Sequence, residues 1–310
     1  MIQITSPNGT PISRFAFGTM QFGGRADEAE SQAMFEASLQ AGITHFDTAH
    51  VYNDGASETL LGRFAAAHRE RLVIATKAGY TGGAGRANLL SQFDISRQRL
   101  DMDMVDILYL HRFDPATDLR ETLDTFAHLR DAGQIRYLGL SNFAAWQVMK
   151  AACIGAAFDL PVGILQPMYS LVKRQAEVEI LPMCASEGIN VAPYSPLGGG
   201  LLTGKYTQGQ PGRLTEDDRY AARYGLDWMH EAAKHLKTIA DELSVAPATL
   251  AVAWAARHAS NPMPILSARS VDQLTPSLAA LDFPMDDALY ERLTALTPTP
   301  PPATDRIEEA

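Results

Sequence analysis

Short apolar runs alternate with helical segments along most of this chain, and this alternation limits the folds open to it. Eight runs predict buried strands at 15–18, 43–47, 72–76, 105–110, 135–140, 162–166, 189–194 and 264–266. Helices are predicted at 27–41, 56–68, 88–100, 118–132, 144–157, 175–187, 247–259 and 271–281. Such an alternation favours an α/β fold, a closed parallel (β/α)8 TIM barrel, which needs roughly 250 residues. The chain, with 310 residues, is long enough.

Several segments fall outside this alternation. Residues 2–17 predict an N-terminal β-hairpin that turns at Asn8-Gly9. The break at 195–226 is rich in Gly, Pro and charged residues, and an extra helix is predicted at 227–243. An open doubly wound sheet is the alternative fold, but no G-x-G-x-x-G follows the first strand. We expect one domain over 1–310, with a Pro-rich, charged tail at 296–310.

Composition excludes some classes of partner. With 26 basic and 36 acidic residues, the formal net charge is −10, and no basic segment indicates nucleic-acid binding. No leader sequence or membrane span is recognisable, so we expect a cytoplasmic protein with no membrane partner. Cys153 and Cys184 are interpreted as reduced thiols, and we expect no metal site. A monomer is possible, because a barrel encloses its own core.

Four polar residues follow three successive predicted strands, and they are the candidate catalytic residues. Asp47 and Tyr52 follow the second strand, Lys77 ends the third and His111 follows the fourth. Because the carboxyl ends of barrel strands meet on one face, these side chains are predicted to converge. Taken singly, each has an ordinary structural explanation: a capping aspartate, a half-buried tyrosine, a surface lysine or a core histidine.

Together these residue types suit carbonyl reduction. A phenol has a pKa near 10 and is a poor acid at neutral pH unless its surroundings change it. We expect the ammonium of Lys77 to lower the pKa of Tyr52, and Asp47 to keep Lys77 protonated and oriented. His111 would then hydrogen-bond the carbonyl oxygen, which Tyr52 protonates.

These segments resemble the aldo-keto reductase family over about residues 10–285. The resemblance lies in "FDTAHVYNDGASE", "IATKAG" and "DILYLHRFD" around the four residues. It continues in order through "GQIRYLGLSNF", "LQPMYSL", "VAPYSPLGGGLLTGKY" and "ILSARSVDQL". It implies an NADPH-dependent oxidoreductase in which Asp47, Tyr52, Lys77 and His111 are catalytic.

The resemblance also implies the residues that hold NADPH. Ser141, Asn142 and Gln166 match those that bind the nicotinamide carboxamide, and Tyr194 matches the aromatic stacked on its ring. Ser195, Leu197 and Gly198 match the segment along the pyrophosphate. Arg269 and Gln273, with Ser267, fall where the family binds the 2′-phosphate, which favours NADPH over NADH. Pro276-Ser277 depart from the usual Glu-Asn of the family, which puts the adenine contacts in doubt.

Substrate residues are harder to predict, because loop conformations determine them. Met20 and Arg112 are the candidates; Arg112 would meet an anionic substrate or would pair with Asp114 or another surface carboxylate.

Three other functions remain open. The same site would also serve a sugar or alcohol dehydrogenase running in the oxidative direction. Some barrels that resemble this family are regulatory subunits of channels with little turnover. A Schiff-base enzyme with Lys77 as nucleophile is the third, and it leaves the tyrosine and the cofactor segments unexplained.

Overall fold

Eight parallel strands form the centre of the molecule, which has the (β/α)8 barrel type of fold. The computed structural model describes residues 2–306 and 308, apart from the side chains of residues 207 and 208. The strands are β1 (Ala16–Gly18), β2 (His45–Asp47), β3 (Val73–Ala78), β4 (Val105–Leu110), β5 (Ile135–Ser141), β6 (Val162–Gln166), β7 (Asn190–Val191) and β8 (Ile265–Leu266). They pair in the order β7-β6-β5-β4-β3-β2-β1-β8.

The two outer strands of this order meet, which closes the ring. The Met263 amide donates to the Val191 carbonyl at 2.7 Å, and the Ile265 amide donates to the Pro193 carbonyl at 2.9 Å. The return bond from β7 is missing because Pro193 has no N–H to donate. The closure therefore rests on bonds donated from the β8 side.

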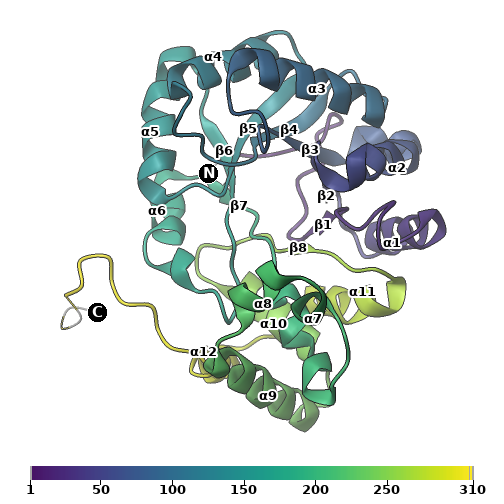
Figure 1. Ribbon diagram of the computed structural model, residues 1–310, viewed down its shortest axis with the longest axis vertical. Helices are drawn as coiled ribbons and strands as arrows, with labels where there is room; N and C mark the ends of the chain where they lie inside the picture. The colour runs from purple at the N-terminus through teal and green to yellow at the C-terminus, as the bar shows by residue number, and fades with distance from the viewer. Residues whose placement is uncertain (1, 307, 309–310) are drawn as a thin grey trace.

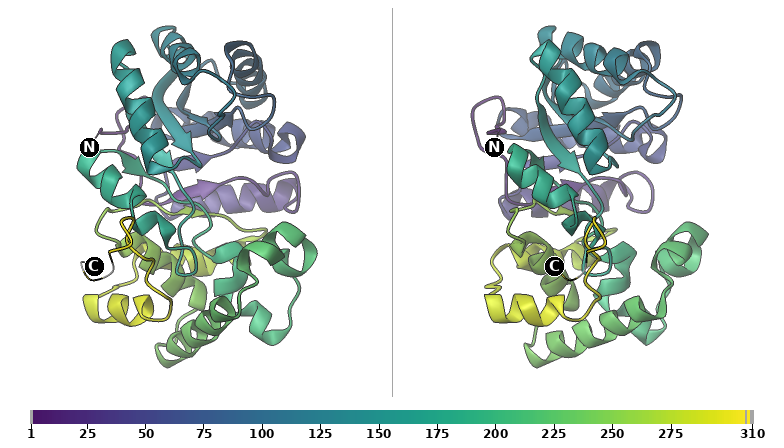
Figure 2. Two further views of the ribbon diagram at one scale, coloured as in Figure 1. Left: turned by 60° about the vertical axis from the view of Figure 1, so that its left-hand side comes forward. Right: turned by 90° about the vertical axis from the view of Figure 1, so that its left-hand side faces the viewer.

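Helices follow the strands and cover the outside of the ring (Figure 1). They are α1 (Glu28–Gln40), α2 (Ala56–Ala65), α3 (Arg86–Leu100), α4 (Leu119–Asp131), α5 (Ala145–Gly155), α6 (Ile180–Glu187), α7 (Arg213–Glu216), α8 (Asp218–Tyr224), α9 (Asp227–Glu242), α10 (Pro247–Arg257), α11 (Val271–Leu278) and α12 (Asp287–Thr294). Figures 1 and 2 show α7–α12, coloured green to yellow, gathered together on one side of the strands.

Side chains alternate along each strand between the barrel interior and the helical layer. In β2, Phe46 faces the helices, and its ring lies 4.7 Å from that of Phe35 in α1. The neighbouring positions His45 and Asp47 are buried on the opposite face. Because the two-residue period of a strand sends Asp47 inward, its carboxylate points toward the barrel axis.

The amino-terminal hairpin covers the end of the barrel at which the strands begin. Its turn forms where predicted, with Gly9 at φ +88° and the Ser6 amide donating to the Thr10 carbonyl at 2.8 Å. A single bridge, between Thr5 and Pro11, flanks the turn, and among the described residues of the hairpin, 2–15, no regular strand forms. Ile4 packs among the interior side chains of the barrel.

The predicted elements agree with this fold, with two omissions. The eight strands overlap the eight predicted strand segments, and helices α1–α6 and α9–α11 overlap the nine predicted helical segments. The segment 195–226 is more ordered than expected: it holds two 3-10 turns, α7 and α8. Helix α12 was not predicted; buried Arg174 donates to the carbonyl of its last residue, Thr294, at 3.1 Å. The tail beyond α12 runs away from the barrel, as Figure 1 shows in yellow.

Among the described residues, no helix taken alone is long and apolar enough to cross a membrane. Helices α9 and α10 meet the length and composition requirement only as a pair bent by 103°.

Close packing of α2 on α3 gives a first testable prediction. A methyl group added at Gly62 would lie 2.2 Å from the backbone carbonyl oxygen of Leu100, which cannot move without shifting α3. We expect Gly62→Ala to lower the free energy of unfolding by about 1–3 kcal/mol, measured by urea denaturation.

Gly85→Ala is the matched control. Its new methyl group would make only an ordinary contact, 3.5 Å from a Glu121 oxygen, at a φ of −68° that any residue adopts. We expect this control to change stability by less than about 0.5 kcal/mol. Equal stability of the two variants would show that α2 and α3 are not packed as described.

Candidate active site

The four predicted catalytic residues lie together at the carboxyl ends of β2, β3 and β4. Asp47 is the last residue of β2, Lys77 lies one residue before the end of β3, and His111 directly follows β4. Tyr52 begins a 3-10 turn, Tyr52–Gly55, in the loop after β2. The structure thus brings together residues that are up to sixty-four positions apart in the sequence.

Lys77 is the centre of this group, and none of its side chain is exposed. Its ammonium forms an ion pair with Asp47 and donates to the Thr48 carbonyl at 2.7 Å. The second Asp47 oxygen accepts a hydrogen bond from the Gln166 amide at 2.9 Å. Burial is the largest single effect and lowers the pKa of Lys77, but Asp47 and Tyr52 together oppose it, and the pKa is raised. The lysine is therefore positively charged at neutral pH.

Tyr52 lies beside that charge, with the Lys77 Nζ 5.1 Å from the centre of its ring. Burial raises the pKa of the phenol, and the ammonium only partly opposes this effect. The expectation of a lowered pKa for Tyr52 is therefore wrong, because desolvation of the phenolate is the larger effect. In this state the phenol keeps its proton, as a proton donor must.

His111 completes the group as a neutral imidazole. Its ring meets that of Tyr52 edge-on, with centroids 6.0 Å apart and an interplanar angle of 84°. Burial, followed by the charges of Lys77 and Arg112, lowers the pKa of His111 to about 3. Its Nδ1 is buried without a hydrogen-bond partner in the part of the chain that is described. A neutral imidazole offers one N–H donor to a substrate oxygen.

The loop that carries Tyr52 is held in an unusual conformation. Asn53, Asp54 and Gly55 all have positive φ angles, of 48°, 53° and 96°. Such backbone is costly for residues other than glycine and persists only when neighbouring contacts fix it. The Asn53 side-chain amide supplies two of these contacts, donating to the carbonyls of Met20 at 2.9 Å and Phe22 at 2.8 Å.

A buried carboxylate fixes the other side of the same loop. Glu58 in α2 has no exposed surface, and it accepts a hydrogen bond from the Thr76 hydroxyl at 2.6 Å. Arg99 of α3 pairs with Glu58 at 3.2 Å and donates to the His50 carbonyl at 2.9 Å. Because Thr76 precedes Lys77 and His50 shortly precedes Tyr52, this pair ties the strand of the lysine to the loop of the tyrosine.

Sequence reasoning missed this pair, although a signal was present. Glu58 lies three and seven positions before Leu61 and Ala65, both fully buried on the same face of α2. An acidic residue on an apolar helical stripe indicates a buried partner.

The predicted carboxamide-binding residues lie next to the catalytic group, at the ends of β5 and β6, and Tyr194, predicted to stack on the nicotinamide ring, follows β7. Ser141 ends β5 and its hydroxyl donates to the Gln166 carbonyl at 3.1 Å. Asn142 donates to the His111 carbonyl at 3.0 Å and accepts from the Tyr194 hydroxyl at 2.7 Å. A hydroxyl and two amides at one rim are donors and acceptors that suit a carboxamide, and the Tyr194 ring beside them offers a flat face for stacking.

The predicted pyrophosphate segment leads away from Tyr194. Ser195 has a φ of +60°, and Leu197 precedes a 3-10 turn, Gly198–Thr203. A Cβ at Gly199 would lie 2.8 Å from the Tyr220 ring, so only glycine lets α8 pack this closely on the segment.

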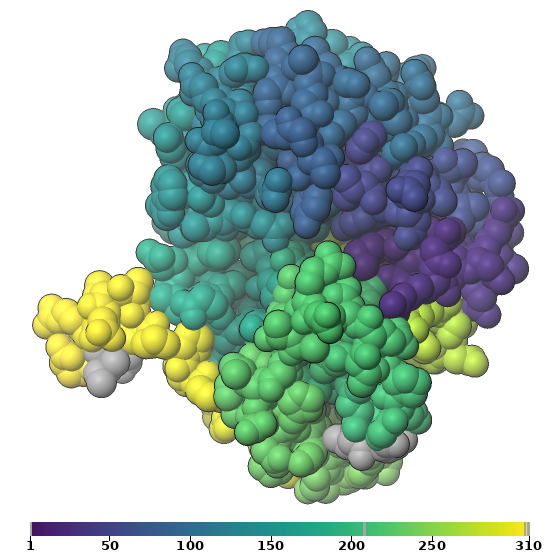
Figure 3. Space-filling view, in the orientation of Figure 1, coloured from purple at the N-terminus to yellow at the C-terminus, as the bar shows by residue number. Residues whose placement is uncertain are grey.

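Basic side chains gather where the 2′-phosphate was predicted. Arg269 is half-buried, and its guanidinium lies 3.6 Å from the carboxylate of Glu216, which also pairs with Arg25 at 2.9 Å. Burial and the neighbouring Arg269 lower the pKa of Lys205, and Glu216 opposes that effect. Three cations around one carboxylate suit a phosphorylated ligand. Figure 3 shows the segment after β7, which carries Glu216, in green, against the segment that follows β1, in purple.

The other residues predicted at this end differ in exposure. Ser267 and Gln273 are exposed. Ser277 is buried, and the Pro276 carbonyl accepts a hydrogen bond from the Thr249 hydroxyl at 2.7 Å.

Comparison with known sequences agrees with this geometry. A sequence model of the aldo/keto reductase family matches residues 14–298. This chain belongs to that family.

Proteins similar to this chain carry different names. A probable voltage-gated potassium channel subunit beta of Oryza sativa subsp. japonica is 33% identical over 295 residues, covering 89% of each chain. Aflatoxin B1 aldehyde reductase member 2 of Homo sapiens is 34% identical over 300 residues, or 88% of this chain and 83% of that one. An uncharacterized oxidoreductase, YrpG, of Bacillus subtilis is 31% identical over 313 residues, covering 94% of each.

The two predicted substrate residues of this aldo/keto reductase family member lie on either side of the catalytic group. Met20 is half-buried in the loop after β1, and its carbonyl accepts a hydrogen bond from the Asn53 side-chain amide. Arg112 is exposed, with its guanidinium 5.0 Å from the centre of the Tyr80 ring.

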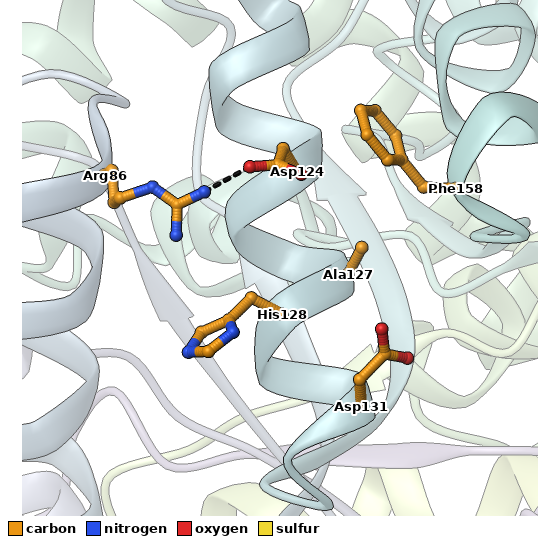
Figure 4. Close-up of a pocket in the computed structure, with 6 residues that line it drawn as sticks. All are labelled: Arg86, Asp124, Ala127, His128, Asp131 and Phe158. Atoms are coloured by element: carbon orange, nitrogen blue, oxygen red, sulfur yellow. Dashed lines mark hydrogen bonds and ion pairs between the residues drawn. The ribbon is translucent and has the colours of Figure 1, made fainter.

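Two surface cavities lie away from the barrel mouth. One of about 270 Å³ lies on the outer helices (Figure 4); it is lined by Arg86, Asp124, Ala127, His128, Asp131 and Phe158. Another of about 330 Å³ lies between α9 and the segment after β7, with Tyr206, Leu214 and His230 in its lining. Neither contains any of the four predicted catalytic residues.

The Glu58–Arg99 pair gives a prediction about stability. Glu58→Ala removes one partner of a buried ion pair and leaves the Thr76 hydroxyl without its acceptor. We expect a loss of about 3 kcal/mol in the free energy of unfolding, measured by chemical denaturation.

Glu36→Ala, at an exposed position of α1, serves as the control. It removes the same charge and is expected to change stability by less than about 0.5 kcal/mol. Similar losses in the two variants would contradict the role given to Glu58.

Proposed function

We propose that this protein is an NADPH-dependent reductase that converts an aldehyde or ketone to an alcohol, with Tyr52 as proton donor. One observation carries the proposal: the Tyr52 phenol lies beside a buried lysine–aspartate ion pair, with the His111 imidazole next to it. A phenol can protonate an alkoxide if a fixed positive charge stabilises the phenolate that results.

Each residue has a separate task in this mechanism. A reduced nicotinamide, when bound, supplies the hydride that reaches the carbonyl carbon. His111 donates a hydrogen bond to the carbonyl oxygen and fixes its direction. Tyr52 gives its proton to that oxygen as negative charge develops there, so hydride and proton together complete the alcohol. Lys77 stabilises the phenolate, and Asp47 keeps Lys77 charged.

The proposed cofactor follows from the chemistry of the rim. Ser141, Asn142 and Gln166 would hold the carboxamide, and the ring of Tyr194 would stack on the nicotinamide. Arg269 would take the 2′-phosphate and exchange Glu216 for it, because a guanidinium binds phosphate in a planar, charge-assisted arrangement.

The test of the catalytic role is Tyr52→Phe. We expect kcat for aldehyde reduction to fall by about 10²–10⁴-fold, the usual contribution of a general acid. The dissociation constant of NADPH, measured by fluorescence titration, is expected to change by less than about twofold.

Tyr137→Phe makes the same change near the opposite end of the barrel, where the Tyr137 hydroxyl accepts from the Thr5 amide at 3.2 Å. This control should keep full activity. Undiminished kcat in Tyr52→Phe would remove the tyrosine from the mechanism.

The test of the cofactor assignment is Arg269→Met. We expect the dissociation constant of NADPH to rise about tenfold or more, because a charge-assisted contact to phosphate is lost. That of NADH should barely change. Arg257→Met, at a half-buried arginine paired with Asp287, should alter neither. Equal weakening of both nucleotides in Arg269→Met would refute a 2′-phosphate contact.

Two alternatives use the same site. Microscopic reversibility allows the residues to oxidise a sugar or alcohol, with Tyr52 as the base, and the ratio of forward to reverse kcat distinguishes the directions. Relatives named as potassium channel beta subunits favour a regulatory role with little turnover. Tight nucleotide binding without reduction of any aldehyde, ketone or sugar would favour that role over ours.

The Schiff-base alternative is the weakest of the three. A nucleophilic lysine needs a lowered pKa, so that the free amine is present. The pKa of Lys77 is raised instead.

A further inference from the structure

An arginine that makes no ion pair with a described carboxylate lies beside the imidazole of the candidate active site; Asp114 is near enough to feel its charge. Arg112 directly follows His111, and its side chain is exposed. Within the described part of the chain no carboxylate forms an ion pair with it. This is notable in a chain with a formal net charge of −10, where acidic residues outnumber basic ones.

The nearest carboxylate in the sequence is used elsewhere. Asp114 accepts hydrogen bonds from the Thr117 hydroxyl at 2.6 Å, the Ala84 amide at 2.9 Å and the Ala116 amide at 3.0 Å. These hydrogen bonds hold the Asp114 carboxylate against its own loop. The second possibility raised for Arg112, a surface pair with Asp114, is therefore not realised.

Aromatic rings hold the guanidinium in place and connect it to the catalytic group. The Arg112 Cζ lies 5.0 Å from the Tyr80 centroid, and the Tyr80 ring lies 4.9 Å from that of His111. His111 in turn meets Tyr52 at 6.0 Å. A guanidinium stacked on a ring face keeps its N–H edge free for a planar, two-oxygen acceptor.

The surface next to Arg112 is apolar and flat. The Phe113 ring packs edge-on against Phe143 at 5.4 Å and against Trp146 at 5.8 Å. Trp146 is 60% exposed, a large apolar area for a single side chain. An anion bound at Arg112 would thus have aromatic side chains beside it, Tyr80 and the Phe113 cluster.

We propose that Arg112 binds the carboxylate of the substrate, and that the preferred substrates are aldehydes or ketones joined to a carboxylate by a flat apolar spacer. This proposal rests on the reductase function proposed above and names its substrate class. The Arg112 guanidinium and the His111 imidazole lie 5.0 and 4.9 Å from the same Tyr80 ring, so we expect a spacer of about one aromatic ring to join a carboxylate at Arg112 to a carbonyl at His111.

The experiment compares two aldehydes that differ in charge. 4-Carboxybenzaldehyde carries the carboxylate, and methyl 4-formylbenzoate replaces it with a neutral ester. We expect wild-type kcat/KM to favour the acid by about tenfold or more, mostly through KM, as a charge-assisted pair provides. This preference should shrink as salt is raised, because ions screen an exposed charge.

Arg112→Met should bring the acid-to-ester ratio close to one, and Arg112→Lys should restore part of the preference. Arg120→Met is the matched control, since Arg120 also stacks on a ring, 5.2 Å from that of Phe158, but lies on α4 in the outer layer of helices. It should keep the wild-type ratio. Equal kcat/KM for acid and ester in wild type, or an unchanged preference in Arg112→Met, would overturn the proposal.

Failure of the reductase function would look different. Neither aldehyde would then be reduced, and the anion site would be judged by calorimetry with 4-(hydroxymethyl)benzoate. Binding that is about tenfold weaker in Arg112→Met would sustain the site without the reaction. Equal binding in both proteins would reject the site as well.

Discussion

The ion pair between Lys77 and Asp47 is the interaction on which the rest of the site depends. A lysine with no exposed surface loses its hydration, and only close partners compensate for that loss. Here they are the Asp47 carboxylate and the Thr48 carbonyl. Because buried ion pairs add little to stability compared with apolar packing, this one is best explained by chemistry. It keeps a permanent positive charge next to the phenol of Tyr52.

The two halves of the barrel carry different kinds of side chains at their strand ends. Strands β2 to β4 end in the ion pair and the imidazole, whereas β5 to β8 end in amides, hydroxyls and cations suited to an elongated, phosphorylated ligand. Gln166 joins the halves, since its amide bonds Asp47 while its strand end lies among the cofactor candidates. A change on the cofactor side can therefore reach the ion pair through a single side chain.

Much of the fold could be predicted from the sequence, because strands and helices leave periodic patterns. The convergence of Asp47, Lys77 and His111 followed from one rule, that barrel strands end on the same face. What could not be predicted depends on distances through space. The raised pKa of Tyr52 reflects burial that no local pattern encodes. Likewise, the pairing of Glu58 with Arg99 joins residues forty-one positions apart.

The most direct test of the central claim follows the hydride itself. The protein would be incubated with NADPH deuterated at the reactive nicotinamide carbon and a panel of aldehydes and ketones, and the products examined by mass spectrometry. The account predicts an alcohol with one deuterium on its carbinol carbon, lost from the nucleotide. Alcohol without deuterium, or nucleotide binding with no alcohol from any carbonyl compound, would contradict it.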